Sequence, residues 1–194
     1  MNDTNKTKIN KCDYGYLKNK LNKEIIKTII LFAVPIAIII FGYIKEGTNK
    51  NIFTLIAVLG LLPAANNFVT TIMVIKAQKW SCSKELYEKI TSAVDLTQIN
   101  VRFDLYMTGY EKTFPIQSIC CVGNSLIGYT NSKDYDDVKF EDHLKPLLSQ
   151  NSLKVGTIKI FTNEDKYIAR LSEERLKQDD HDNAVLHLME NISL

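Results

Sequence analysis

Two stretches of the sequence contain no charged residue. Residues 28–44 form an uncharged run of seventeen residues, and residues 52–75 form a second run of twenty-four. A helix needs roughly 20 apolar residues to cross a hydrocarbon core about 30 Å thick, and lysines at its ends extend a shorter run. Neither run carries the polar stripe of a helix in a soluble protein. The missing charge therefore predicts two transmembrane spans and argues against a soluble protein.

The first run also lacks the marks of a cleaved signal peptide. It starts late, has no small-residue cleavage site, and is followed within a few residues by the second run. The connection between the runs, KEGTNKN at residues 45–51, is short and rich in turn-forming residues. Helices joined by so short a loop lie antiparallel. We therefore expect a transmembrane hairpin over residues 25–77.

Lysines are fewer between the two runs than outside them. Residues 1–27 hold seven lysines against three acidic residues, and three more lysines closely follow the second run, whereas the connection holds two. The positive-inside rule then predicts a multi-pass protein of the cell membrane with both termini cytoplasmic, and a basic cytosolic segment over residues 1–24 beside the lipid bilayer. The residues expected to anchor the spans at the membrane interfaces are Lys27, Lys45, Lys76, Lys79 and Trp80.

Cysteines are few, and all four lie outside the two runs. Cys12, Cys82, Cys120 and Cys121 show no spacing typical of a disulfide framework, which predicts reduced thiols in a cytosolic compartment. Cys120 and Cys121 are adjacent in an expected strand. Their side chains should therefore point to opposite faces of a sheet, which argues against a shared metal site.

The second run contains a proline and two adjacent asparagines. Pro63 removes a backbone donor and predicts a kink, and an amide side chain in hydrocarbon needs a hydrogen-bond partner. Local repair of the kink is one alternative. A polar pore or transported-substrate site is another, but no intramembrane charge marks an ion path. The third is contact between helices: successive residues point about 100° apart, so one asparagine would face the first span and its neighbour a second copy. The sequence thus predicts a homo-oligomer with a helix–helix interface at Gly60, Pro63, Ala64, Asn66 and Asn67.

Residues 80–178 have the pattern of a small cytosolic α+β domain. Alternating residues and the turn signal at Gly123–Asn124 predict an antiparallel meander of three strands. The first strand is expected to have one buried face, with Asp104 and Tyr106 on the other. In the helix that follows, Val138 is expected to point inward, and Pro146 is expected to bend or break the helix. Residues 179–194 are expected to form an acidic tail with a short helix. The expected elements are a helix at 83–94, strands at 99–107, 114–122 and 126–130, a helix at 134–151, a strand at 154–161 and a helix at 162–178.

This order, α-β-β-β-α-β-α, resembles the core of the restriction-endonuclease-like fold. Enzymes of that fold carry an acidic residue on the second strand and an acid-x-lysine on the third, where this sequence reads FPIQSICCV and SLIGYT. The resemblance implies a domain that has lost nuclease activity. The stretches IAVLGLLPAANNFVTTIM and YEKTFPI…VGNSLIGYT also make the chain similar to a family of small two-span bacterial membrane proteins with a cytosolic α+β tail.

The domain lacks the basic face of a nucleic-acid-binding protein. Residues 80–194 carry ten Lys and three Arg against eighteen Asp or Glu, so we expect no nucleic-acid partner. The segment DDHDN at residues 179–183 could bind a metal with His187, but a solvated helix start explains it better, and we expect no metal and no cofactor. Aromatic residues expected around the turns of the meander predict a surface for a protein partner: Tyr106, Tyr110, Phe114 and Tyr129.

Taken alone, the sequence predicts an α+β membrane protein that binds rather than catalyses. Its function would be that of a membrane-anchored scaffold or sensor that self-associates through its spans. The alternatives left open are an enzyme at the membrane surface, either a hydrolase or a transferase, and a sensor of a nucleotide or another small molecule.

Overall fold

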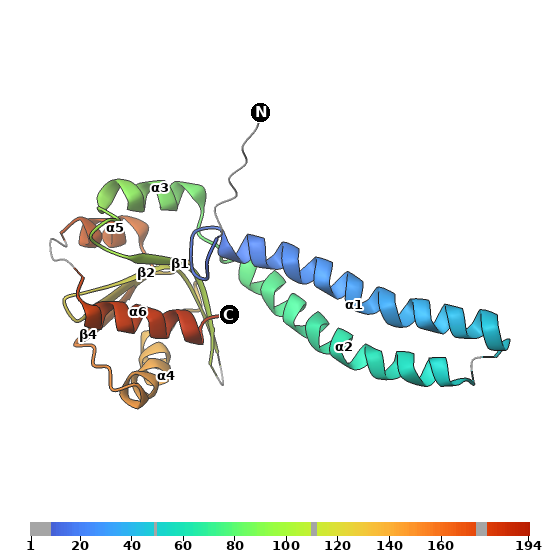
Figure 1. Cartoon of the computed structure of the whole chain (residues 1–194). Coiled ribbons are helices and arrows are strands. Elements are labelled where there is room, and N and C mark those ends of the chain that lie inside the picture. The colour runs from blue at the N-terminus through green and yellow to red at the C-terminus, as the bar shows by residue number, and fades with distance from the viewer. Residues whose placement is uncertain (1–8, 49, 110–111, 174–177) are drawn as a thin grey trace. The chain divides into compact units, whose positions relative to one another are not determined.

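A computed structural model describes residues 9–48, 50–109, 112–173 and 178–194, which form two compact units (Figure 1). One unit is a pair of long helices, Leu17–Gln78. The other joins the described residues up to Tyr16 with Lys79–Leu194. The coarse fold class expected from the sequence is confirmed, because two long apolar helices precede a small α+β domain with a mixed sheet.

The first unit consists of α1 (Tyr16–Glu46) and α2 (Ile52–Gln78). By length and composition, both helices are long and apolar enough to cross a membrane. Each helix continues through an internal proline, Pro35 in α1 and Pro63 in α2. The expected bend at Pro63 therefore does not interrupt α2.

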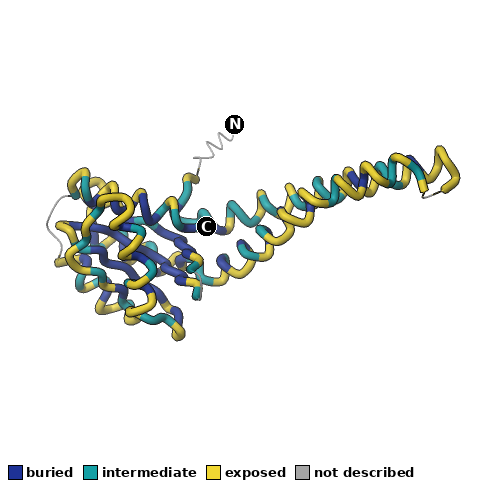
Figure 2. The backbone as a smooth tube through the Cα atoms, turned by 90° about the horizontal axis from the view of Figure 1, so that it is seen from below, coloured by how far each residue is buried: buried dark blue, intermediate teal, exposed yellow. Residues whose placement is uncertain are grey.

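Large apolar side chains cover the outside of both long helices. Figure 2 shows these helices mostly in the colours of exposed and half-buried residues, whereas the strands of the domain are mostly buried. Leu62 is 68% exposed and is one of many such side chains. Others on the two helices are Ile30, Val34, Ile40, Leu55 and Leu59.

The domain is built on a four-stranded sheet in the order β1-β2-β3-β4. The first three strands form the expected antiparallel meander, and β4 pairs with β3 in parallel. Gly123 and Asn124 both have positive φ in the turn between β2 and β3, as a tight hairpin requires. The strands are β1 (Val101–Thr108), β2 (Thr113–Val122), β3 (Ser125–Tyr129) and β4 (Thr157–Phe161).

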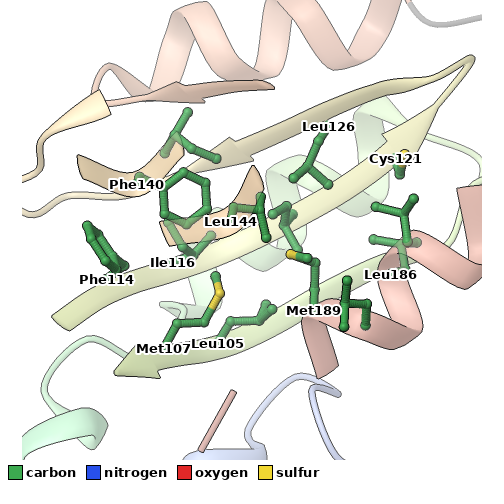
Figure 3. Close-up of a cluster of buried hydrophobic side chains, with 14 of the residues drawn as sticks. Leu105, Met107, Phe114, Ile116, Cys121, Leu126, Phe140, Leu144, Leu186 and Met189 are labelled. Carbon is green, nitrogen blue, oxygen red and sulfur yellow. The ribbon is translucent and has the colours of Figure 1, made fainter. Parts of the chain in front are cut away.

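Two helices cover each face of the sheet. In Figure 1, α3 (Lys84–Ala93) and α5 (Glu164–Glu173) lie on one face, and α4 (Asp137–Gln150) and α6 (Asp180–Ile192) lie on the other. Two hydrophobic clusters result, one of which is shown in Figure 3. Cys121 belongs to the cluster beneath α4 and α6, and Cys120 to the opposite one, which confirms that they point to opposite faces.

The single buried face predicted for the first strand is wrong. Asp104 and Tyr106 were expected to face solvent, but both are buried because helices cover the two faces of the sheet. Asp104 also has a φ of 57°, a left-handed conformation within a strand. Its carboxylate accepts hydrogen bonds from the Cys82 amide at 2.7 Å and the Ser81 hydroxyl at 3.0 Å.

Helix α4 differs from its prediction in two respects. It runs through Pro146 to Gln150, so the proline does not break it. The carbonyl that loses its donor belongs to Asp142, and both of these residues are exposed, so water can replace the missing bond. Val138, expected to point inward, is 68% exposed.

The C-terminal residues are part of the domain rather than a separate acidic tail. The segment folds as α6, and its apolar side chains recur at the helical spacing of three and four residues. Val185, Leu188 and Met189 are buried in the cluster of Figure 3. The domain therefore extends from the expected limit at residue 178 to the end of the chain.

Segments from both ends of the described chain cover the outer edge of β1. The Phe103 amide donates to the carbonyl of Cys12 at 2.8 Å. Further along the strand, the Tyr106 amide donates to Ser193 Oγ at 2.9 Å, and the Leu194 amide donates to the Tyr106 carbonyl at 3.0 Å. This edge is therefore closed to another strand.

Candidate functional site

The hairpin contains a polar cluster at the contact between its two helices. Asn67 Nδ2 donates to Thr28 Oγ1 at 2.8 Å, and the hydroxyls of Thr28 and Thr71 lie 2.7 Å apart. The Thr71 hydroxyl also lies 3.0 Å from the Asn67 carbonyl oxygen. Asn67 and Thr71 are both buried. The Asn67 side-chain amide therefore has a hydrogen-bond partner on the other helix of the hairpin.

Small and polar residues line the same side of α2 at alternating spacings of three and four. This spacing is typical of helices that pack along a seam, and small residues let the two backbones approach. A Cβ atom added to Gly60 would lie 3.3 Å from Pro35 Cγ of α1. The buried residues of α2 on this seam are Ala57, Ala64, Asn67, Thr71 and Val74.

Asn66 lies on the outer surface of the hairpin, unlike its neighbour Asn67. Its side chain is exposed and has no hydrogen-bond partner among the residues that the structure describes. Only its backbone carbonyl is engaged further, by the Thr70 hydroxyl at 3.3 Å. Leu59, Leu62 and Val69 are exposed near it on α2.

The predicted interface residues therefore divide into two groups. Ala64 and Asn67 are buried in the contact between α1 and α2, and Gly60 approaches α1 closely, whereas Pro63 and Asn66 are exposed. Sequence reasoning missed Ala57 and the partners on α1, Thr28 and Pro35. The spacing of three and four among small residues was the signal for Ala57.

Among the alternatives for the two asparagines, Asn67 makes a contact between helices. Its amide bonds a hydroxyl of the other helix. Within the described part of the chain, no hydrogen bond joins either asparagine side chain to the carbonyl of Leu59, which Pro63 leaves without its helical donor.

The expected membrane anchors are mostly exposed. Lys27 Nζ lies 4.0 Å from a Glu24 oxygen, and Lys45 Nζ lies 5.4 Å from the ring centre of Phe53. Trp80 is half-buried. The exposed anchor lysines are Lys27, Lys45, Lys76 and Lys79.

The aromatic surface predicted for a protein partner is wrong at its three described positions. Tyr106, Phe114 and Tyr129 are all buried, because the helices cover both faces of the meander. Tyr129 stacks on Tyr167 with ring centres 5.6 Å apart. The fourth position, Tyr110, lies outside the described residues.

The acidic segment at the start of α6 stabilises the fold. Asp179, His181 and Asp182 bring their ligand atoms within 4.8 Å of one another. The Asp182 carboxylate, however, accepts hydrogen bonds from the amides of Gly123 at 3.0 Å and Asn124 at 3.1 Å. Burial alone would raise the pKa of Asp182, but these donors, with the Cys121 thiol, outweigh it and lower that pKa.

The thiols of the domain are buried, and the pKa values of Cys12, Cys82 and Cys121 are raised. All four cysteines are free and buried. Burial, with a smaller contribution from the Glu190 carboxylate, raises the pKa of Cys12 to about 12. Burial and then the Asp104 carboxylate raise the pKa of Cys82 to about 12. Because the thiolate is the reactive form, these thiols are unsuited to nucleophilic chemistry at neutral pH.

Comparisons of the chain with protein-family models, with curated proteins and with solved structures find no match. The resemblances drawn from the sequence therefore stay predictions.

Proposed function

We propose that the chain is an integral membrane protein that α1 and α2 anchor and that self-associates through the exposed face of α2. The first support is the apolar outer surface of the hairpin, where side chains such as Leu62 and Ile30 are largely exposed. An apolar surface that extends along two long helices is unfavourable in water, so lipid or another protein must cover it. The lengths of the two helices match the thickness of a bilayer, so lipid is the cover that fits them best.

The domain supports a hairpin that enters and leaves on the same side of the membrane. The segment before α1 and the segment after α2 belong to one folded unit, joined by the hydrogen bond from Phe103 to Cys12. A single folded unit lies on one side of a bilayer. The lysines outside the two runs favour the cytoplasmic side, and the free cysteines fit a reducing compartment.

The main support for self-association is the exposed side-chain amide of Asn66. Its side chain is unpaired among the described residues and lies in the middle of an apolar helix. An unsatisfied amide in hydrocarbon is costly, whereas a hydrogen bond between transmembrane helices contributes about 0.6–2 kcal/mol. The same side chain on a second copy offers both a donor and an acceptor.

The domain would then act by binding, at the cytoplasmic surface of this assembly. Groups that could support catalysis are used in the fold instead. The Asp179 side chain caps α6, and the Asp182 carboxylate fixes the turn between β2 and β3. The buried thiols of Cys12 and Cys82 have raised pKa values.

Cysteine crosslinking of the full chain in lipid vesicles tests the self-association. Leu62→Cys introduces an exposed thiol about one helical turn from Asn66, whereas Ile72→Cys lies about 120° around α2 from Asn66. We expect oxidation to link copies through Cys at position 62 and not at position 72. Asn66→Leu should abolish the link at position 62, and Asn66→Gln should retain it because it keeps the amide.

Asn67→Leu is the matched control, because it removes the neighbouring amide from inside the hairpin. It should leave the crosslink at position 62 largely in place. If Asn66→Leu crosslinks as well as the parent chain, self-association through Asn66 is wrong, and membrane anchoring would stand by itself.

A further inference from the structure

The two edges of the sheet differ in what covers them. The edge at β1 is closed by Cys12, Ser193 and Leu194. The edge at β4 pairs only with β3 on its inner side. Among the described residues, no backbone group bonds to its outer side. Open edges bind extended peptides by strand addition.

The hydrogen bonds to β3 identify the backbone groups of β4 that face outward. The Thr157 amide donates to the Asn124 carbonyl at 3.5 Å, and the Phe161 carbonyl accepts from the Thr130 amide at 2.9 Å. Residues that alternate with these face the other way. The amides and carbonyls of Ile158 and Ile160 therefore point away from the sheet.

A cavity of about 650 Å³ adjoins the first part of β4 and the turn between β2 and β3. It is formed by the end of α4, the connection to β4 and the first part of β4, with Leu148, Leu153 and Ile158 among its apolar lining residues. A helix and an open strand that flank an apolar groove suit a peptide whose alternate side chains enter the groove.

The charges around the groove select an acidic peptide. Lys145 and Lys154 line it, and no carboxylate does among the residues that the structure describes. Lys145 is paired with Glu141 at 2.5 Å, whereas Lys154 is exposed and its ammonium has no partner among the described residues. Lys154 is thus the cation available to a carboxylate of the peptide.

We propose that β4 binds an extended segment of a partner protein in which acidic and apolar residues alternate, as a fifth strand of the sheet. A second copy fits this edge less well. Antiparallel pairing of two β4 strands about their central residue sets Lys159 of one copy opposite Lys159 of the other, and like charges directly opposite each other destabilise a sheet. The inference rests on the proposed binding role of the domain but not on self-association through Asn66.

Peptides with methylated backbones provide the sharpest test. The probe is a labelled heptapeptide in which glutamate alternates with valine, and its binding to the full chain in detergent micelles is measured by fluorescence anisotropy. N-methylation of one alternating set of amides should weaken binding at least tenfold, and methylation of the other set should change it less than threefold. Strand addition alone requires this asymmetry. Equal binding of the two methylated peptides would overturn the proposal.

Reversing the charge of a single lysine tests whether the acidic peptide binds beside the groove. Lys154→Glu should weaken binding of the acidic heptapeptide about tenfold, whereas Lys166→Glu on the opposite face should leave it unchanged. Equal effects of the two substitutions would show only a general charge attraction and would contradict the site.

The same measurements in an Asn66→Leu background separate this inference from the proposed self-association. Peptide affinity should be unchanged there. If the peptide instead dissociates residual dimers of that variant, a second copy is the occupant of β4 and the proposed partner is wrong.

Discussion

The hairpin and the domain bury opposite kinds of side chain. In the domain, large apolar residues such as Phe140 and Leu144 fill the interior, and the buried carboxylates of Asp104 and Asp182 are hydrogen-bonded there. In the hairpin, Ala64, Asn67 and Thr71 are buried, and isoleucine and leucine side chains point outward. Each unit follows the rule of its proposed surroundings. Water drives apolar side chains inward, whereas in lipid close packing and hydrogen bonds hold helices together.

The largest effect is expected from a cavity in the domain core. Phe140→Ala removes a fully buried ring and should lower the free energy of unfolding by about 3–5 kcal/mol. Denaturant unfolding of the full chain in micelles, followed by the fluorescence of the single tryptophan, Trp80, measures it. Leu62→Ala is the matched change on the outer face of α2 and should cost less than about 0.5 kcal/mol. Equal losses would show that the hairpin also depends on burial from water.

A smaller loss of folding free energy is expected when the buried Asp182 carboxylate is replaced by a neutral amide. Asp182→Asn weakens hydrogen bonds from the amides of Gly123 and Asn124 and should cost about 1.5–3 kcal/mol at neutral pH. The folded-state pKa of Asp182 is lowered. Its stabilisation is therefore complete above the unfolded value, about 3.9, and is lost as the pH falls through the folded value.

Unfolding of the parent chain and Asp182→Asn between pH 7 and pH 2 checks this expectation. The stability of the variant should change less over the acidic part of that range. If the free energies of unfolding of the two proteins changed equally with pH, Asp182 would not contribute to the acid sensitivity.

Overpacking the contact between α1 and α2 should destabilise the hairpin by about 1–3 kcal/mol. Ala64→Leu places a large side chain where α2 meets α1, whereas Ala65→Leu places the same side chain on the exposed surface next to it. The helicity of the full chain is measured in mixed micelles as the fraction of dodecyl sulfate increases. Relative to the parent chain, it should fall at a lower fraction of dodecyl sulfate for Ala64→Leu and at the same fraction for Ala65→Leu. A similar shift for both variants would contradict the assigned seam.

The smallest expected effect concerns one hydrogen bond. Asn67→Leu removes the bond to Thr28 and should destabilise the hairpin by about 0.6–2 kcal/mol. Asn66→Leu should not lower the stability of a single hairpin. The same detergent titration, at a protein concentration too low for self-association, distinguishes the two. A larger loss from Asn66→Leu would exchange the roles of the two asparagines.

Much of the fold could be predicted because its signals are local. The uncharged runs predict two long helices, and alternation with the Gly123–Asn124 turn predicts the meander. The errors arise where tertiary contacts override those signals. Asp104 alternates like a surface residue, but its carboxylate is buried with Ser81 and Cys82, which lie more than twenty positions earlier in the chain.

The candidate site was predictable in composition but not in arrangement. Adjacent asparagines indicate polar contacts, and the angle between successive helical residues implies that they point in different directions. The sequence alone does not say which of them faces α1, because Thr28 becomes the partner of Asn67 only when the two helices pack in one register. The aromatics of the meander were misplaced for a similar reason: their covering helices come from residues far away in the sequence.

The hydrogen bond between Cys12 and Phe103 also sets an order of events during synthesis. The two residues are about ninety positions apart, and the whole hairpin lies between them. At roughly 5–20 residues per second, the ribosome delivers Phe103 about 5–20 s after Cys12. During that interval both long helices emerge while the domain cannot yet close. Docking of the early segment is therefore a late step of assembly, and it joins the finished domain to a pair of helices made before it.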